Sequence, residues 1–265
     1  NPDRRWLNIE RLQSYLFSGE PALQTEAVRT LAAQSNPRRV HLLAKVASDA
    51  SLPDSVRADA VAGLAAFVDA RRPLLEKLSR DEAASVRREA TRVLRLAETD
   101  GSPGETKPQA GDTDAWLKLL GREPGDAESG RRLFYSTLGA RCARCHRHTG
   151  RGSRIGPELT RAGQELGRRR LLESILQPSL EIAPQHQAWV LQTDAGQTLT
   201  GLRVPQAGDN GVERYNDANG RIFALPSSRI DERSQSPVSL MPAGLERLIS
   251  VQDFRDLLAF LGGHD

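Results

Sequence analysis

Residues 139–150 read GARCARCHRHTG, and this stretch decides which fold we expect for the second half of the chain. It holds both cysteines of the protein, Cys142 and Cys145, with His146 directly after the second. A C-x-x-C-H pattern is compatible with a structural zinc site, a redox-active dithiol or the covalent attachment of a haem. The residues around the motif favour these three chemistries unequally.

A structural zinc ion needs four ligands, so a C-x-x-C pair normally comes with a second pair of cysteines or histidines. His146 would crowd a tetrahedral site because it is adjacent to Cys145. A thioredoxin-type dithiol follows a β-strand at the start of a helix, whereas helices are predicted before this motif. Both alternatives stay open. The histidines that could complete a zinc site are His146, His148, His186 and His264.

Haem attachment gives every residue of the motif a role. The two thiols add to the vinyl groups of the ring, and the next residue then lies under the iron. His146 offers its Nε2 to the metal, while its Nδ1–H needs an acceptor that holds the imidazole plane. The sequence therefore predicts one haem c, bound through Cys142 and Cys145 and ligated by His146.

The segment IGPELT, residues 155–160, follows shortly after the motif. C-x-x-C-H followed by G-P-x-L resembles the c-type cytochromes, in which the proline carbonyl accepts the imidazole proton. The resemblance gives this role to Pro157 and places Ile155 and Leu159 at the haem edge. Arg154, like Arg144, is a candidate partner for a haem propionate.

Later segments extend the resemblance over about residues 126–262. They are similar to the planctomycete and verrucomicrobial type of haem-binding module, a c-type cytochrome often fused behind HEAT-like repeats and a propeller-type dehydrogenase domain. Glu158 departs from the pattern, since the family usually has Asp there. The matching segments are LLESILQPSLEIAP (171–184), QAWVLQTDAGQTLTGL (187–202), SLMPAGL (239–245) and DFRDLLAFL (253–261).

The resemblance also indicates the second axial ligand. Met241 is the single methionine of the chain and precedes the last predicted helix, as the distal methionine does in mono-haem cytochromes. A thioether ligand favours Fe(II) and raises the reduction potential relative to two histidines. His186 is the alternative, because His148 is too close to His146 to reach the opposite face of the ring.

Three similar segments occur upstream: LQTEAVRTLAA (23–33), VRADAVAGLAA (56–66) and VRREATRVLRL (86–96). They are offset by 33 and 30 residues, and the apolar positions of each lie on one helix face. Helix pairs that repeat at this spacing stack into a solenoid. The stretch resembles short HEAT-type repeats.

The hydrophobic period changes to two over residues 186–232, which predicts five short strands in a small β-barrel. The predicted fold is therefore mainly α, a HEAT-like α-solenoid followed by a class I-like cytochrome c domain with this barrel inserted. The predicted solenoid covers residues 1–99 and the cytochrome domain residues 115–265. Residues 100–114, rich in Gly and Pro, are predicted to be the linker between them.

Charge is unevenly distributed. Residues 131–170 carry eleven arginines against Glu158 and Glu165, a net charge of +9 in a chain of net +3. Such a patch could face nucleic acid, an acidic protein or a bound anion, or simply be solvated surface, and we expect no nucleic-acid partner. The chain has no apolar run near the ~18 residues that a membrane span needs.

No hydrolase, metalloprotease or phosphate-binding motif occurs, so single-electron transfer is the expected function rather than catalysis in its own right. The expected partner is a redox protein or a fused dehydrogenase domain. Thioether haem is assembled outside the cytoplasm in bacteria, which predicts a periplasmic location. The alternatives are a haem-based sensor or enzyme with a displaceable distal ligand, and a zinc-containing binding module.

Overall fold

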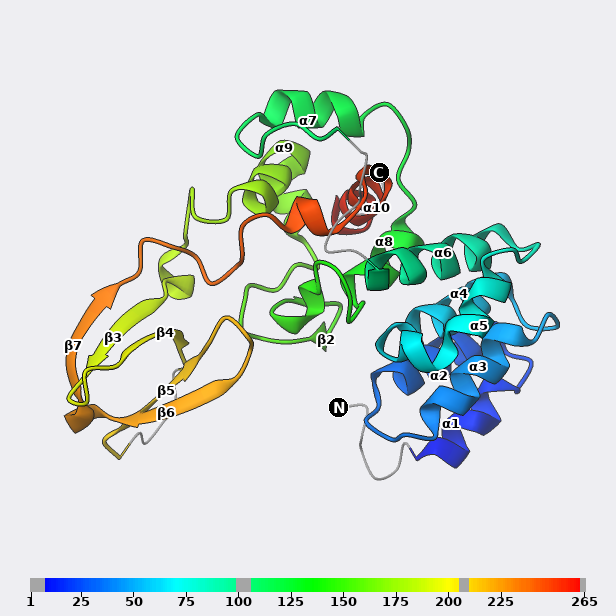
Figure 1. Cartoon of the computed structure of the whole chain (residues 1–265), viewed down its shortest axis with the longest axis horizontal. Coiled ribbons are helices and arrows are strands. Elements are labelled where there is room, and N and C mark those ends of the chain that lie inside the picture. The colour runs from blue at the N-terminus through cyan, green and yellow to red at the C-terminus, as the bar shows by residue number, and fades with distance from the viewer. Residues whose placement is uncertain (1–7, 99–105, 205–209, 263–265) are drawn as a thin grey trace. The chain divides into compact units, whose positions relative to one another are not determined.

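The computed structural model describes residues 8–98, 106–204 and 210–262 (Figure 1). These residues form ten α-helices, a five-stranded antiparallel sheet and a two-stranded sheet. The chain divides into two compact units, each assembled from separate stretches of sequence. The first comprises Asn1–Glu105, Glu128–Arg141 and Arg247–Asp253, and the second comprises Thr106–Ala127, Cys142–Glu246 and Phe254–Asp265.

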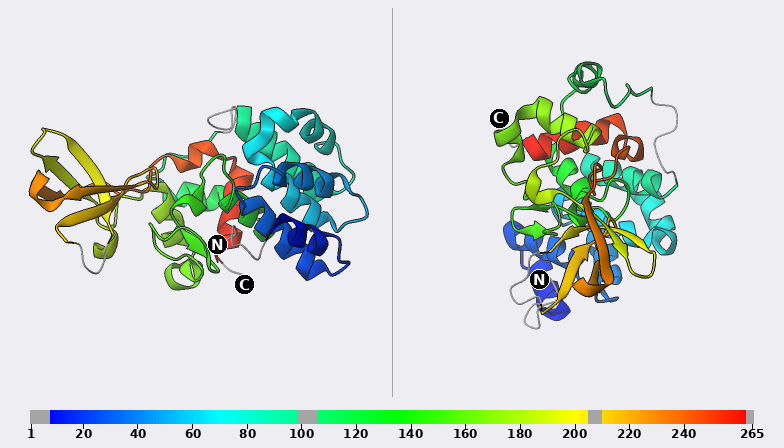
Figure 2. Two further views of the ribbon diagram at one scale, coloured as in Figure 1. Left: turned by 90° about the horizontal axis from the view of Figure 1, so that it is seen from below. Right: turned by 90° about the vertical axis from the view of Figure 1, so that its left-hand side faces the viewer.

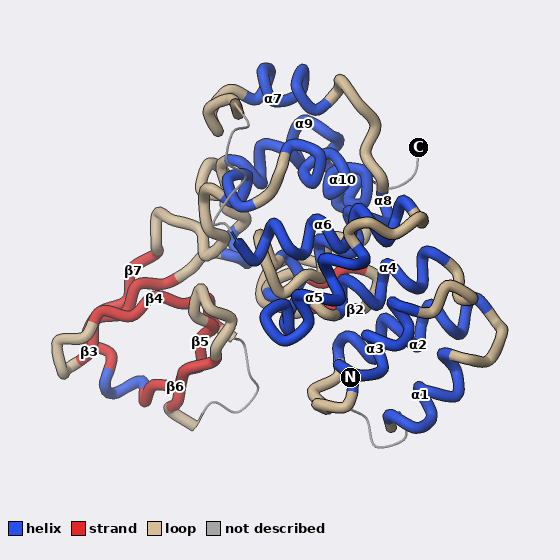
Figure 3. The backbone as a smooth tube through the Cα atoms, turned by 45° about the vertical axis from the view of Figure 1, so that its right-hand side comes forward, coloured by secondary structure: helices blue, strands red, loops and turns tan. Residues whose placement is uncertain are grey.

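The first unit begins with six helices, which Figure 3 shows as successive blue segments. The three similar segments of the sequence lie in its second, fourth and sixth helices, and these pack against one another in that order. Local signals start the first two helices: the Asn8 side chain accepts a hydrogen bond from the Arg11 amide, and Pro21 occupies the first helical position. The six helices are α1 (Ile9–Leu16), α2 (Pro21–Ala33), α3 (Arg39–Ser48), α4 (Asp54–Gly63), α5 (Val68–Leu78) and α6 (Ala84–Glu98).

These helices approach one another closely because small residues lie where they meet. A Cβ atom on Gly63, at the end of α4, would lie 2.9 Å from the Ala32 Cβ and 3.1 Å from the Leu43 Cδ1. The Leu43, Val46 and Val61 side chains are fully buried beside it. Close packing of this kind is costly to disturb, since even one added methyl group must displace a neighbour.

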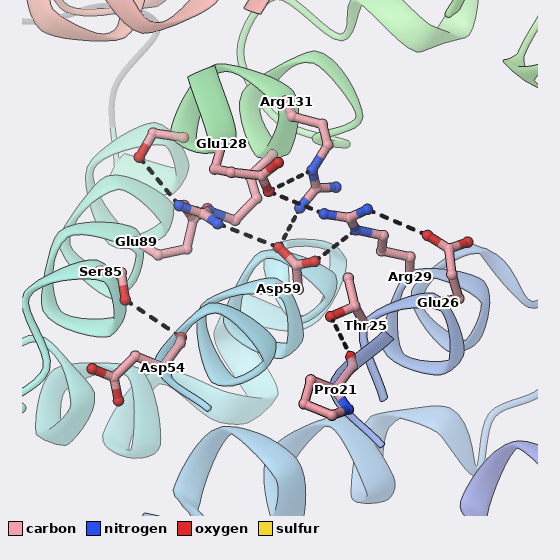
Figure 4. Close-up of polar contacts among 12 residues, drawn as sticks. Pro21, Thr25, Glu26, Arg29, Asp54, Asp59, Ser85, Glu89, Glu128 and Arg131 are labelled. Carbon is pink, nitrogen blue, oxygen red and sulfur yellow. Dashed lines mark hydrogen bonds and ion pairs between the residues drawn. The ribbon is translucent and has the colours of Figure 1, made fainter. Parts of the chain in front are cut away.

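Helix α8 (Ala127–Phe134) lies far from the repeat helices in sequence, yet its residues from Glu128 onward belong to the first unit. Its arginines enter a network of charged side chains that joins α2, α4, α6 and α8 (Figure 4). Asp59 on α4 is the centre of this network and is almost fully buried. The other charged members are Arg29, Glu89, Arg92, Glu128, Arg131 and Arg132.

Each buried charge of this network has partners of opposite sign. Asp59 accepts from the Arg29 Nε at 2.9 Å and also pairs with Arg131 and Arg132 of α8. Glu89 accepts from the Arg132 Nε at 3.0 Å and pairs with Arg92. Breaking a buried pair leaves an uncompensated charge, so these contacts hold α8 firmly to the repeat helices.

The second unit contains α7 (Thr113–Leu120), α9 (Ala162–Leu176) and most of α10 (Val251–Gly262). The fully buried Trp116 of α7 packs edge-to-face on Phe254 of α10, with ring centroids 5.4 Å apart. Helices α9 and α10 touch through glycine, because a Cβ on Gly163 would lie 2.3 Å from the Gly262 Cα. The predicted linker is described only from residue 106 onward, and there the Lys107 Nζ donates to the Glu246 carbonyl at 3.0 Å.

The same unit carries the five-stranded sheet, seen from two directions in Figure 2. All neighbouring strands are antiparallel, in the order β6-β5-β4-β3-β7. Its small core consists of Leu191, Tyr215 and Ile230, with partly buried apolar neighbours. The strands are β3 (Trp189–Thr193), β4 (Thr198–Arg203), β5 (Val212–Asn216), β6 (Ile222–Pro226) and β7 (Ile230–Gln235).

The predicted fold class was wrong. The described residues form a mixed α and β structure with an open sheet, not a mainly α protein with a closed barrel. Strands β6 and β7 are consecutive in the chain but form the two opposite edges of the sheet, with β7 paired to β3. A closed barrel would require β6 and β7 to pair with each other, and among the described residues they do not. Along β7 only Ile230 is buried, which leaves little apolar surface to enclose in a barrel. Alternation of apolar residues predicts strands but does not reveal whether the sheet closes.

Within the described ranges, no helix combines the length and the apolar character that crossing a membrane requires.

Candidate haem-attachment site

The cysteine motif folds as a single helical turn, the 3-10 segment η2 (Cys142–Arg144) and the two residues after it. The Cys142 carbonyl accepts hydrogen bonds from the Cys145 amide at 3.1 Å and from the His146 amide at 2.9 Å. Positions i, i+3 and i+4 of such a turn are neighbours on one face. Both cysteines are partly exposed and form no disulfide, so two thiols and one imidazole are gathered at one place.

His146 is held by the segment that follows it. Its Nδ1 lies 3.0 Å from the Pro157 carbonyl oxygen. Gly156 packs directly on the ring, where a Cβ atom would come within 2.6 Å of the imidazole Cε1. Any side chain at position 156 would displace the ring, so glycine is required there. With Nδ1–H donated to Pro157, Nε2 is left with the lone pair that a metal ligand needs.

The loop is closed on the motif by backbone hydrogen bonds. The Gly156 amide donates to the Cys145 carbonyl at 2.7 Å, and the Leu159 amide donates to the Arg147 carbonyl at 2.8 Å. A two-stranded hairpin, β1 (Arg147–His148) with β2 (Arg151–Gly152), lies between these contacts. The sequence around IGPELT is therefore folded back against the motif by main-chain contacts that do not depend on side-chain identity.

The electrostatics of the site favour a neutral imidazole and neutral thiols. Burial lowers the pKa of His146, the bond to Pro157 opposes this shift, and the positive form of His186 adds to it. Burial raises the pKa of Cys142 to about 12 and also raises that of Cys145, against the nearby Arg144. Redox-active dithiols typically have a thiol of lowered pKa, which is the opposite direction.

The same residues were also candidates for a zinc site. Within the described part of the chain, no group of three or more His, Cys, Asp or Glu side chains is arranged to hold a metal ion. His148 is buried against Phe260, with ring centroids 4.2 Å apart. His264, the fourth histidine considered for zinc, lies outside the described residues. The donor set fits a covalent haem better, with two neighbouring thiols and one oriented imidazole.

The remaining predicted residues lie in two places. Ile155 and Leu159 are partly exposed on the loop that carries Gly156, and Arg154 is exposed beside them. Met241 is partly exposed between β7 and the 3-10 segment η5 (Leu245–Leu248), and its amide donates to the Ser239 hydroxyl at 3.1 Å. Its role as a distal ligand stays a prediction.

His186 ends the short 3-10 segment η3 (Pro184–His186) and belongs to the same unit as His146. It is close enough to His146 for its charge to lower the pKa of that residue. The Nδ1 of His186 is buried, and among the described residues it has no hydrogen-bond partner. A buried imidazole nitrogen without a partner among the described residues is unusual, and it makes His186 a second candidate ligand besides Met241.

Two sets of arginines in this region have protein partners. Arg144 donates to the backbone carbonyl and side-chain oxygen of Asn219, and its pairing with a propionate stays a prediction. Six of the eleven arginines in 131–170 form ion pairs with acidic side chains, and Arg132 is almost fully buried. Glu158 and Glu165, the partners of two of these arginines, are already counted in the +9, so four of the eleven arginines pair with acidic residues outside the window. The six are Arg131, Arg132, Arg147, Arg161, Arg169 and Arg170.

Sequence reasoning did not find Asn219 and Gly220, which contact the motif from the strand insert. These two residues belong to the sequence DANG (217–220) between β5 and β6, and nothing near it in the sequence indicates what this turn packs against.

No protein-family model matches this chain, and no curated protein sequence matches it significantly.

Proposed function

We propose that this chain is a mono-haem c-type cytochrome of the planctomycete and verrucomicrobial type, which transfers single electrons. The observation that carries the proposal is the fixed orientation of His146, with Nδ1 3.0 Å from the Pro157 oxygen and Gly156 against the ring. In c-type haem sites the ligating histidine donates its other ring N–H to a fixed acceptor, which sets the plane and the basicity of the imidazole.

Each residue of the loop then has one role. Cys142 and Cys145 hold the ring through thioethers, and His146 supplies Nε2 to the iron. Ile155 and Leu159 shield the edge of the ring from water, and Arg154 is assigned to a propionate. The bound haem supplies reversible one-electron chemistry, while the protein contributes ligand choice, burial and docking.

The proposed partner is a redox protein or a dehydrogenase domain fused to this chain, with no role for nucleic acid. The proposed location is the periplasm, because thioether haem is assembled outside the bacterial cytoplasm. Support comes from Cys142 and Cys145, which form no disulfide and lie one helical turn apart, with His146 directly after the second.

Covalent haem is tested by producing the chain together with a c-type cytochrome maturation system. The denatured protein should keep its colour after acid–acetone extraction, and its mass should exceed that of the polypeptide by one haem. Cys142→Ala and Cys145→Ala should each reduce haem retention, whereas His148→Ala, in the same loop but packed on Phe260, should retain it. A colourless protein with the mass of the bare polypeptide would contradict the proposal and favour the zinc-containing module.

The distal ligand has two candidates, Met241 from the resemblance and His186 from its unsatisfied buried Nδ1. If Met241 is the ligand, Met241→Ala should abolish the weak charge-transfer band of a ferric His/Met haem and lower the reduction potential, and His186→Ala should do neither. If His186 is the ligand instead, the wild-type ferric protein should lack this band, Met241→Ala should leave the spectrum and the potential unchanged, and His186→Ala should change both. Rapid CO binding by the wild-type ferrous protein, without denaturant, would instead favour the sensor or enzyme alternative.

A further inference from the structure

The turn between β5 and β6 is tightly built. The Asp217 Oδ1 accepts hydrogen bonds from the Asn219 and Arg221 amides, both at 2.8 Å. The Gly220 amide donates to the Asp217 carbonyl at 2.9 Å, and Gly220 has a φ of +75°. That left-handed conformation favours glycine, so the sequence DANG specifies this turn.

The turn contacts the cysteine motif, although 75 residues separate the bonded pair. The Arg144 Nε and Nη2 both donate to the Asn219 carbonyl oxygen, at 2.8 and 2.5 Å, and Nη2 lies 3.3 Å from the Asn219 Oδ1. A Cβ atom on Gly220 would lie 3.4 Å from the Ile155 Cδ1 and 3.7 Å from the Arg144 Cγ. The turn is thus packed against both segments that carry the site.

These two contacts are well placed to affect the site. Arg144 lies between Cys142 and Cys145, so a hydrogen bond from its guanidinium restrains the residue that joins the two thiols. Ile155 precedes Gly156, the residue that packs on His146. Hydrogen bonds from a charged donor are stronger than neutral ones, and a guanidinium offers two N–H groups in a fixed geometry.

A second turn of the same sheet provides a comparison. Gly196, in the turn between β3 and β4, has a φ of +74°, nearly that of Gly220. An added Cβ there would meet no described atom within 4 Å. The sheet therefore presents one turn in open space and one turn seated on the cysteine motif, with the same backbone conformation at the glycine.

We propose that the turn at residues 217–220 is a clamp on the haem-attachment loop: it holds Arg144 and covers Ile155, and it thereby positions the loop and shields the haem edge. This inference rests on the proposed function. Asn219 and Gly220 are positioning residues, since they act through Arg144 and Ile155. The strand insert is then part of the haem site.

The test compares five variants of the full-length, haem-loaded chain. Gly220→Val and Arg144→Ala break the clamp from its two sides, and a double variant combines them. Gly196→Val imposes the same backbone strain on the open turn, and Arg229→Ala removes the exposed pair with Asp194 at the far side of the sheet. The measurements are amide hydrogen exchange over residues 142–146 and the reduction potential of the haem.

Both clamp variants should speed exchange over residues 142–146 by about tenfold, the effect of losing one hydrogen bond to a charged group. Both should also lower the reduction potential, because a more exposed haem stabilises the oxidised, more highly charged state. The double variant should equal the stronger single variant, since one clamp is broken in each case. Gly196→Val and Arg229→Ala should leave both quantities unchanged.

The clamp is overturned if Gly196→Val shifts the potential as much as Gly220→Val does. A second outcome also overturns the clamp: Arg144→Ala lowers the reduction potential, but Gly220→Val changes neither the potential nor the exchange rates. In that case Arg144 acts on a propionate and not through the turn. Haem retention by the denatured wild-type chain is measured first. If the chain carries no haem but the clamp variants still speed exchange over residues 142–146, the contact between the turn and the loop is supported. Only the proposed function is then refuted.

Discussion

The apolar core of the first unit contains 23 buried side chains among the described residues, whereas the core of the five-stranded sheet contains three. Each repeat helix packs on neighbouring helices of the unit, but the sheet is open and has much of its surface exposed. The first unit thus derives its stability from many contacts of similar size. The sheet depends on a small number of apolar contacts.

The polar contacts of the first unit also join a larger part of the structure than those of the sheet do. The charge network at Asp59 adds to a large apolar core, while in the sheet Glu213 bridges the Tyr215 hydroxyl, at 2.6 Å, and Arg233 beside a small one. Glu213 and Tyr215 are both almost fully buried. The ion pairs of Asp59 and of Glu213 therefore have different structural roles. Those of Asp59 hold α8 to a unit that already has a large apolar core, whereas that of Glu213 holds together a sheet with a small one.

The largest effect is expected at Asp59. Asp59→Ala leaves the buried Arg132 without one of its partners and should lower the free energy of unfolding by about 3–5 kcal/mol. Denaturant unfolding followed by circular dichroism measures this loss. Glu10→Ala removes an exposed pair with Arg38 and should change stability little. Similar losses in the two variants would show that burial is not what makes the Asp59 network important.

Leu191→Ala and Leu43→Ala remove the same atoms from the two cores and should each cost about 2–5 kcal/mol. The consequence should differ. Leu191→Ala is expected to make the strand insert sensitive to protease while the helical signal is kept, and Leu43→Ala should lower the cooperative unfolding of the helices. Protease cleavage mapped by mass spectrometry distinguishes them. Equal protection of the insert in both variants would mean that the sheet does not depend on its small core.

The smallest effect is expected at Glu213, where the hydrogen bond from Arg233 lowers the carboxyl pKa from 4.5 to about 2. A lowered folded-state pKa contributes stability that is present above pH 4.5 and is lost as the pH falls toward 2. Glu213→Gln should therefore cost roughly 2–3 kcal/mol at neutral pH and remove this acid dependence. Hydrogen exchange of strands β5 and β7 between pH 5 and pH 2.5, corrected for intrinsic rates, measures it. An acid transition of the sheet that persists in the variant would assign it to another group.

The sequence indicated much of the local structure. The three similar segments all lie in helices, and strands occur where the apolar period is two, because side-chain periodicity is a local property. The cysteine motif and the segment around Gly156 and Pro157 were also recognisable, since both are short and their spacing is set by one loop. The positions of Met241 and Arg154 toward a haem stay predictions.

Long-range pairing was not accessible in this way. The partners of Arg132 are 43 and 73 residues away, and nothing near α8 indicates that its arginines pair with Glu89 and Asp59. The division into units also differs from simple sequence order, since residues 128–141 and 247–253 group with the repeat helices. The predicted boundaries at 99 and 115 rested on composition, which does not reveal such pairing.

The chain by itself determined which segments become helices, strands and turns, and it placed two thiols and an imidazole within one helical turn. These outcomes follow from backbone preferences and side-chain spacing over a few residues. Only the tertiary structure decided that the sheet stays open, that the Asn219 turn is seated on Arg144, and that Arg132 of α8 is buried rather than exposed. Each of these depends on which surfaces meet across tens of residues, where burial and charge pairing outweigh local preference.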